Sequence, residues 1–177
     1  MNARNKPNCT GMSKIKGKTV NQSIVIMSQS MSFQDANQSG NVHGGVIMKL
    51  IDTAGGVVAM RHARCNVVTA SIDRLDFYDP VYVGDYVTLK ASINYVGRTS
   101  MEVGVRVESE NLMTGKIRHT SSAYLTYVGL DKERRPMPLP PLILKTAEDK
   151  RRNREAGIRR EVRLAEKKSE KKSQDKG

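Results

Sequence analysis

The 177-residue chain is long enough for one domain with a sizeable core and too short for two typical domains. Its formal net charge of +12 lies at the two ends of the sequence. Residues 1–18 hold five basic and no acidic side chains, residues 145–177 hold 13 basic and seven acidic ones, and a charge of +1 remains for residues 19–144. A domain built to bind nucleic acid carries a basic face on the fold itself, so we expect no nucleic-acid partner.

No stretch approaches the roughly 20 continuous apolar residues of a membrane span, and no apolar run follows the basic N-terminal segment. We therefore expect neither a membrane span nor a signal peptide, and we predict a cytoplasmic protein. The cysteines, Cys9 and Cys65, indicate no disulfide framework. The histidines, His43, His62 and His119, are too scattered to predict a metal site.

The first 20 residues lack periodicity and are rich in Lys, Asn and Gly, which predicts a disordered basic leader. A weakly alternating run at 23–31 predicts a first strand, and turn formers at 35–45 predict a loop. Apolar residues then recur at every third and fourth position, which predicts a helix to about residue 63; they are Val46, Ile47, Leu50, Ile51, Ala54, Val57 and Val58. Gly55 and Gly56, each costing about 1 kcal/mol relative to Ala inside a helix, predict the close approach of another backbone.

Alternation with a period of two begins after Asn66 and predicts a series of strands. They cover about 67–77, 86–95, 101–108 and 117–130, and turn formers separate them. One early helix followed by a run of antiparallel strands predicts an α+β fold, in which a single curved antiparallel sheet wraps one long central helix.

A charged C-terminal helix is predicted by the capping-box pair Thr146 and Asp149. Two pairs of opposite charge, each one turn apart, support it: Glu148 with Arg152 and Glu155 with Arg159. Its apolar stripe is thin and consists of Ile158, Val162 and Ala165. We predict a solvated helix that frays at its end; docking on a partner subunit and attraction of anionic groups are the alternatives.

The candidate catalytic residues lie at the start of the central helix. Asn37 and the pair Gly44-Gly45 belong to the loop before it, and Asp52 lies two turns inside it. Glycines at a helix start let N–H groups and the positive end of the helix dipole approach a carbonyl oxygen, as an oxyanion site requires. Asp52 follows apolar helix residues, where desolvation would make a carboxylate more basic. Taken alone, these residues also fit a tight turn, a solvent-facing Asp and a capping role for His43.

The sequence resembles the hot-dog fold acyl-CoA thioesterases of the cytosolic long-chain (brain-type) acyl-CoA hydrolase family in four motifs, DANQSGNVHGGVIMKLIDTAG, NVVTASID, VGRTSMEV and AYLTYVGLD. The similarity keeps their order and spacing from about Met27 to Pro141. It implies a hot-dog domain at 21–141, between the leader at 1–20 and a basic helical tail at 142–177. It also implies a homodimer, commonly assembled into a trimer of dimers and so a homohexamer, that hydrolyses fatty acyl-CoA. Coenzyme A then enters as part of the substrate, and we expect no separate cofactor.

The resemblance also implies roles for single residues. Asn37 and Asp52 match the family's catalytic Asn and Asp, and Gly44 and Gly45 match glycines whose N–H groups face the thioester carbonyl. The surface along which pantetheine and nucleotide lie is matched by Val68, Thr69, Gly97, Arg98, Thr99 and Ser100. Arg98 is the candidate for a coenzyme A phosphate, because a guanidinium pairs well with phosphate oxygens.

Thioester hydrolysis needs a base for water, a polar group that positions the water, and donors for the developing oxyanion. Asp52, Asn37 and Gly45 can take these roles in that order, and an acyl-enzyme route through Asp52 is equally compatible. The absence of a G-x-S-x-G motif excludes a serine-hydrolase thioesterase. Two alternatives remain: a hot-dog hydratase or dehydratase that would use His43, and a non-catalytic module that binds coenzyme A or a nucleotide and uses its basic tails for acidic partners.

Overall fold

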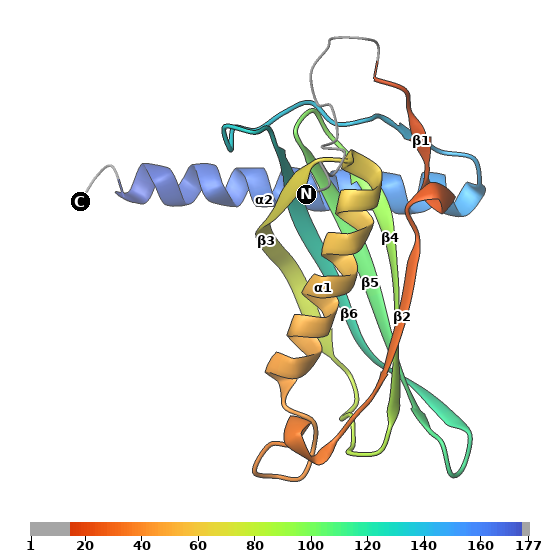
Figure 1. Cartoon of the computed structure of the whole chain (residues 1–177). Coiled ribbons are helices and arrows are strands. Elements are labelled where there is room, and N and C mark those ends of the chain that lie inside the picture. Colours follow the sequence, from red (N-terminus) through yellow and green to blue (C-terminus); the bar gives the residue numbers. More distant parts are fainter. Residues whose placement is uncertain (1–14, 175–177) are drawn as a thin grey trace, which may run out of the picture.

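The computed structural model describes residues 15–174. A five-stranded antiparallel sheet forms the centre of the molecule, with the long helix α1 on its inner face and the second helix α2 across its outer face (Figure 1). The predicted α+β arrangement of a helix wrapped by an antiparallel sheet is confirmed.

Helix α1 (Gly44–Ala63) has the predicted apolar face, and its buried residues include Ile47, Leu50, Ile51, Ala54 and Val58. Their spacing of three and four residues places them along one side of the helix, which packs against the sheet. His43 caps the start of α1, because its Nδ1 accepts a hydrogen bond from the Gly45 N–H at 2.9 Å.

The sheet has the strand order β2-β4-β5-β6-β3. Its strands are β2 (Val25–Ser30), β3 (Asn66–Phe77), β4 (Tyr86–Val96), β5 (Ser100–Asn111) and β6 (Lys116–Leu130). Alternate residues of the three middle strands are buried beneath α1; they include Val87, Leu89, Ala91, Ile93, Val103, Val105, Val107, Ala123 and Leu125. Among the described residues β3 pairs with β6 alone, so the other edge of this strand is open.

Two register shifts interrupt β3, between Thr69 and Ser71 and between Ile72 and Arg74. Residues two or four positions apart normally share a face of a strand. Thr69 and Asp73 are four positions apart, but Thr69 contacts α1 on the inner face and Asp73 contacts α2 on the outer face. The bulges therefore place Thr69 and Asp73 on opposite faces of the sheet.

The short strand β1 (Lys18–Thr19) pairs in parallel with β7 (Leu142–Ile143) and leads into the turn η1 (Val20–Gln22). Lys18 also donates from Nζ to carbonyl oxygens in the last turn of α1, those of Arg61 at 2.9 Å and His62 at 2.6 Å. The prediction that residues 1–20 are disordered is therefore wrong for this ordered part, and residues 1–14 lie outside the described residues. Composition gave no sign of the order because it depends on carbonyl groups 43 and 44 residues further along the chain.

The expectation that another backbone passes Gly55 is also wrong. A Cβ atom at Gly55 would lie 2.5 Å from the hydroxyl oxygen of Tyr127, so the glycine makes room for a side chain of β6. At Gly56 the nearest such atom, also of Tyr127, lies 4.0 Å away, which is ordinary contact. Gly55 therefore reflects packing within the chain, whereas nothing in the described residues requires a glycine at position 56.

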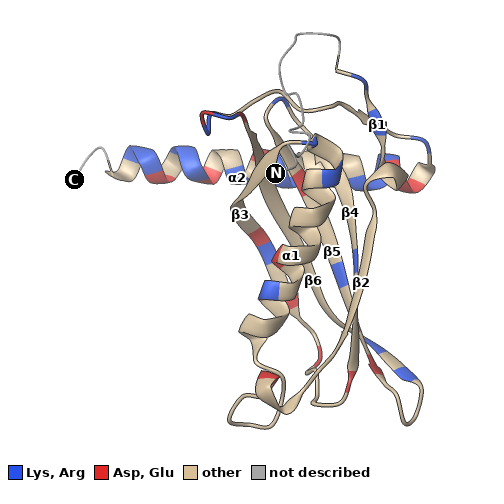
Figure 2. Ribbon diagram, in the orientation of Figure 1, with Lys and Arg blue, Asp and Glu red and all other residues tan. Residues whose placement is uncertain are grey.

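Helix α2 (Ala147–Gln174) begins with the predicted capping box, in which Thr146 Oγ1 accepts from the Asp149 N–H at 3.0 Å. Lys and Arg are dense along this helix and sparse on α1 (Figure 2). The expected pairing of Glu148 with Arg152 is confirmed at 2.7 Å. The expected pairing of Arg159 with Glu155 is wrong, since Arg159 reaches across to Glu102 of β5 instead. The prediction of a solvated helix thus fails for its first half, which packs on the sheet (Figure 1). No helix in the described part of the chain is both long and apolar enough to cross a bilayer.

The η2 turn (Phe33–Asp35) and the loop after it lead the chain from β2 into α1. Backbone hydrogen bonds from His43 to Asp35 at 2.7 Å and from Val42 to Val81 at 2.8 Å fasten this loop at both sides. The loop therefore holds the start of α1 in a defined place.

Candidate active site

Asp52 lies in the middle of α1, and two hydroxyl groups hold its carboxylate. Its Oδ1 accepts from Thr69 Oγ1 at 2.6 Å and from the Tyr127 hydroxyl at 3.2 Å. The side chain is exposed in the single chain, so the expected apolar surroundings of Asp52 are not present there. Two donors from neighbouring strands fix the orientation of this carboxylate.

Tyr127 is the partner of Asp52 that the sequence reasoning missed. It is 1% exposed, and its hydroxyl lies 3.0 Å from the Asp52 carbonyl oxygen as well as near the carboxylate. Burial, and then the negative charge of Asp52, raise the pKa of Tyr127 above its ordinary value, so the hydroxyl keeps its proton and donates. Gly55, three residues after Asp52, was the available signal, because its missing Cβ admits this hydroxyl.

Thr69 was expected along the substrate surface, and the structure places it in direct contact with Asp52. It lies opposite Tyr127 in the β3–β6 ladder, so the two donors approach Asp52 from adjacent positions of neighbouring strands. Val68, the next residue along β3, is 42% exposed. This end of β3 therefore supplies both a carboxylate partner and an accessible apolar side chain.

Asn37 and Gly44 lie together at the start of α1. They line a cavity of about 350 Å³ whose remaining walls are mostly apolar and include Ile47, Phe77, Tyr78, Pro80 and Val81. Asn37 Oδ1 accepts from the N–H groups of Ser39 at 2.9 Å and Asn41 at 3.2 Å, which leaves the amide group as the donor of this side chain. The Gly45 N–H is bonded to His43, so it must exchange this partner before it can serve an oxyanion.

Within one chain, Asp52 and its two hydroxyl donors lie apart from Asn37 and Gly44. Gly44 and Asp52 are eight residues apart on α1, which corresponds to about 12 Å along the helix axis. Asp52 is absent from the cavity that Asn37 lines.

The loop Gly97-Arg98-Thr99-Ser100 joins β4 to β5 at the end of the sheet where α1 finishes (Figure 1). Its backbone is fixed, because the Arg98 carbonyl accepts from the Leu139 N–H at 2.9 Å and the Thr99 carbonyl accepts from the Gly129 N–H at 3.1 Å. The Arg98 side chain is exposed and makes no salt bridge to any described residue. A fixed loop with an available guanidinium suits a phosphate ligand.

A long helix wrapped by a five-stranded antiparallel sheet defines a hot-dog fold protein. The thioesterase superfamily model matches residues 39–116. The cytosolic acyl coenzyme A thioester hydrolase of Mus musculus is 39% identical over 120 residues, which are 67% of this chain and 32% of that protein. The chain thus spans about a third of the length of this mammalian relative.

Solved structures extend the comparison over more of the chain. A hexameric acyl-CoA thioesterase, solved in the apo state, is 39% identical with a TM-score of 0.83, covering 86% of this chain and 97% of the other. An acyl-CoA hydrolase of Staphylococcus aureus, in complex with butyryl coenzyme A, coenzyme A and coenzyme A disulfide, is 32% identical with a TM-score of 0.82, covering 88% of this chain and 95% of the other. Variants of that enzyme with alanine in place of one aspartate, one asparagine or one threonine also have solved structures. The present chain belongs to the acyl-CoA thioester hydrolase family of the thioesterase superfamily.

Proposed function

We propose that this chain hydrolyses the thioester bond of acyl-CoA, with Asp52 as the general base. The observation that carries the proposal is the Asp52 carboxylate, which Thr69 and Tyr127 hold in one orientation on an accessible part of α1. Asp52 takes a proton from water, the water oxygen attacks the carbonyl carbon, and the carbon–sulfur bond breaks. The proton then passes to the leaving thiolate of coenzyme A.

The spacing of the polar residues supports this assignment. In the Staphylococcus aureus enzyme, the asparagine and aspartate replaced by alanine are 15 residues apart, and the aspartate and threonine are 17 residues apart. Asn37, Asp52 and Thr69 have the same separations in this chain. In our proposal Asn37 positions the attacking water, and Gly44 and Gly45 donate N–H groups to the oxyanion.

We further propose that each site is assembled from two chains. Asn37 and the Arg98 loop lie at opposite ends of α1, and an antiparallel two-fold pairing along the open edge of β3 would bring opposite ends of two copies together. Asn37 of one subunit would then face Asp52 of its partner. The hexameric relative supports an assembly of three such dimers.

Acyl-CoA would lie across this shared surface. The mostly apolar cavity beside Asn37 suits an acyl chain, while Val68 and the Gly97–Ser100 loop suit pantetheine and the nucleotide, with Arg98 on a phosphate. No separate cofactor takes part in the proposed reaction. The hydratase alternative is less well supported, because His43 is engaged as the cap of α1. The mammalian relatives, named as cytosolic, support a cytoplasmic location.

A thiol-release assay from acetyl-CoA to palmitoyl-CoA tests the activity and reads the chain-length preference together. Asp52→Asn should lower kcat by at least ~100-fold, because it removes the base but is isosteric. The melting temperature of the variant should stay close to that of the parent. A variant that melts much earlier but keeps its specific activity when folded would show that Asp52 is structural.

A further inference from the structure

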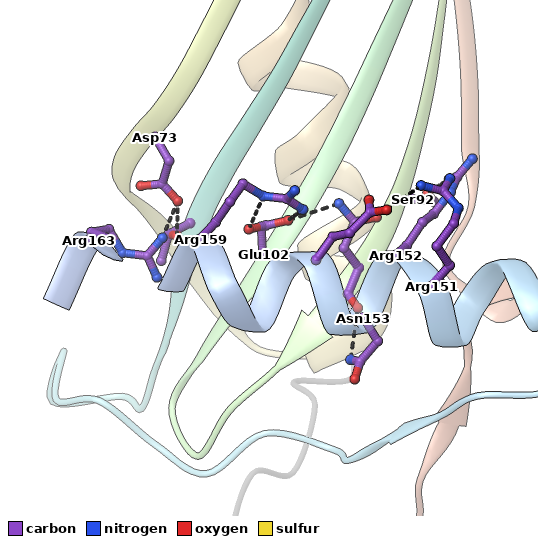
Figure 3. A network of polar contacts seen from close by, with 11 residues as sticks. Asp73, Ser92, Glu102, Arg151, Arg152, Asn153, Arg159 and Arg163 are labelled. Carbon is purple, nitrogen blue, oxygen red and sulfur yellow. Dashed lines mark hydrogen bonds and ion pairs between the residues drawn. The ribbon is translucent and has the colours of Figure 1, made fainter. Parts of the chain in front are cut away.

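Helix α2 crosses the outer face of the sheet from the β2 edge to the β3 edge (Figure 1). Arg152 donates to a serine of β4 at 3.0 Å, and Arg159 binds Glu102 of β5 at 2.7 Å. Arg163 binds Asp73 of the edge strand β3 (Figure 3). These arginine contacts follow the order of the helix, so Arg163 marks the point where α2 reaches the edge of its own sheet.

The helix does not stop at this edge. Residues 164–174, which we call the overhang, continue α2 beyond β3, and every one of them is exposed (Figure 1). Eleven residues of helix measure about 16 Å, which is the width of roughly three neighbouring strands. Any strand that pairs with the open edge of β3 therefore lies beneath the overhang.

We propose that the overhang packs on the outer face of a second copy of this chain, joined along β3, and that the second copy returns the same contact. The inference rests on the proposed two-fold dimer. A two-fold axis repeats every contact, so each dimer would have two such contacts, one from each α2. We call each contact between an overhang and the outer face of the second copy a clasp.

The side of the overhang that would face the second copy carries charged and polar residues. The residues of α2 that contact its own sheet are spaced three or four positions apart; they are Arg152, Ala156, Arg159 and Arg163. The same spacing continues to Lys167, Glu170 and Gln174. The outer face of β3 presents Arg74 and Asp76, which pair with each other at 2.5 Å and are 65% and 30% exposed. Opposite charges on both surfaces favour this contact over a purely acidic or purely basic partner.

Cross-linking between differently tagged chains tests the clasp directly. One chain carries Glu170→Cys and the other carries Arg74→Cys, and both have serine in place of Cys9 and Cys65. We expect a short bismaleimide to join the two tagged chains, because Glu170 of one would lie over β3 of the other. The matched control places the second cysteine at Ser28, which is exposed on β2 at the opposite edge, and should give no mixed product.

Sedimentation of the uncross-linked full chain separates the two proposals. An oligomer without the Glu170–Arg74 product, or with an equal product at Ser28, would overturn the clasp and leave the dimer standing. A monomer at all concentrations would overturn both the clasp and the dimer.

Truncation after Arg163 provides an independent measurement, because it removes the overhang and keeps the contacts of α2 with its own sheet. We expect the dissociation constant of the dimer to rise about tenfold. Removal of residues 175–177 alone is the control and should leave the constant unchanged. An unchanged constant after truncation at Arg163 would refute the proposal.

Discussion

At the scale of single residues, the position of Asp52 depends on hydroxyl donors that come from two different strands. Thr69 is exposed, whereas Tyr127 is buried against the glycine that follows Asp52 by one helical turn. Together the two donors hold the Asp52 carboxylate in one orientation, as the proposed general base requires.

Tyr127→Phe removes one of these donors and keeps the ring in place. We expect kcat to fall about tenfold, because the Asp52 carboxylate loses one of the two donors that fix its orientation. The melting temperature should stay close to that of the parent, because the ring still fills its place beside Gly55. An unchanged kcat would show that Tyr127 acts only through packing.

Arg98→Ala tests the phosphate contact. A remote contact binds the substrate and the transition state about equally, so KM for acyl-CoA should rise more than kcat falls. A short thioester without the nucleotide is the control substrate, and its hydrolysis should not change. Equal losses on both substrates would exclude a phosphate role.

The sequence suggested the candidate site before the structure was known. Asn37, Asp52 and the two helix-start glycines were singled out from the motif and from the family resemblance, and their catalytic roles stay predictions. The hydrogen bond between Thr69 and Asp52 was not predicted. The bulge after Thr69 determines which face that side chain takes, and alternation alone does not reveal a bulge. Tyr127 lies within the predicted strand 117–130, and nothing in the sequence pattern distinguishes it from its neighbours.

At the scale of elements, α1 and the five strands of the main sheet followed the predicted periodicities, because local burial determines which residues alternate. The contacts made by β1 and by α2 could not be predicted, since both depend on polar partners far along the chain. Lys18 reaches the end of α1, and Arg163 reaches a strand residue 90 positions earlier. Charge patterns indicate exposure on average and do not identify such partners.

The end of α1 is also where stability should depend on pH. His62 is fully buried, with Nε2 2.7 Å from the Pro140 carbonyl oxygen and Nδ1 3.3 Å from Ser23 Oγ. Burial, with a further contribution from the positive charge of Lys18, lowers the pKa of His62 below 6.5, while the hydrogen bond to Pro140 opposes the shift. Below that pH the unfolded chain binds a proton that the folded chain resists, so stability is retained above about pH 6.5 and declines as the pH falls.

Melting temperatures at about pH 7.5 and about pH 5.5 test this consequence. The parent should lose more stability over this interval than His62→Gln, which keeps a donor for the Pro140 carbonyl and cannot be protonated. Identical losses in the two proteins would assign the pH dependence to other groups.

At the scale of the whole molecule, the proposed shared site predicts complementation. Asn37→Ala and Asp52→Ala chains, each inactive alone, form mixed dimers in which one site carries both lesions and the other carries neither. With random pairing, about half the dimers are mixed and about a quarter of all sites are intact. We therefore expect roughly a quarter of the parent activity in the thiol-release assay.

The control is a chain that carries both substitutions, co-expressed with the parent and verified to form mixed dimers. If Asn37 and Asp52 act within one chain, each site of the Asn37→Ala and Asp52→Ala mixture keeps one lesion. Activity at the level of the separate variants, despite verified mixed dimers, would contradict a shared site.

The parallel pairing of β1 with β7 bears on how this unit can be used in longer proteins. Lys18 pairs with Leu142, so the segment that leads into β2 adjoins the segment that leads from β6 into α2. Residues 20–141, which include α1 and the five strands of the main sheet, therefore form a unit whose two ends are neighbours, and α2 is an addition packed on its outer face. A unit of this kind can be inserted into or repeated along a polypeptide without rethreading its sheet.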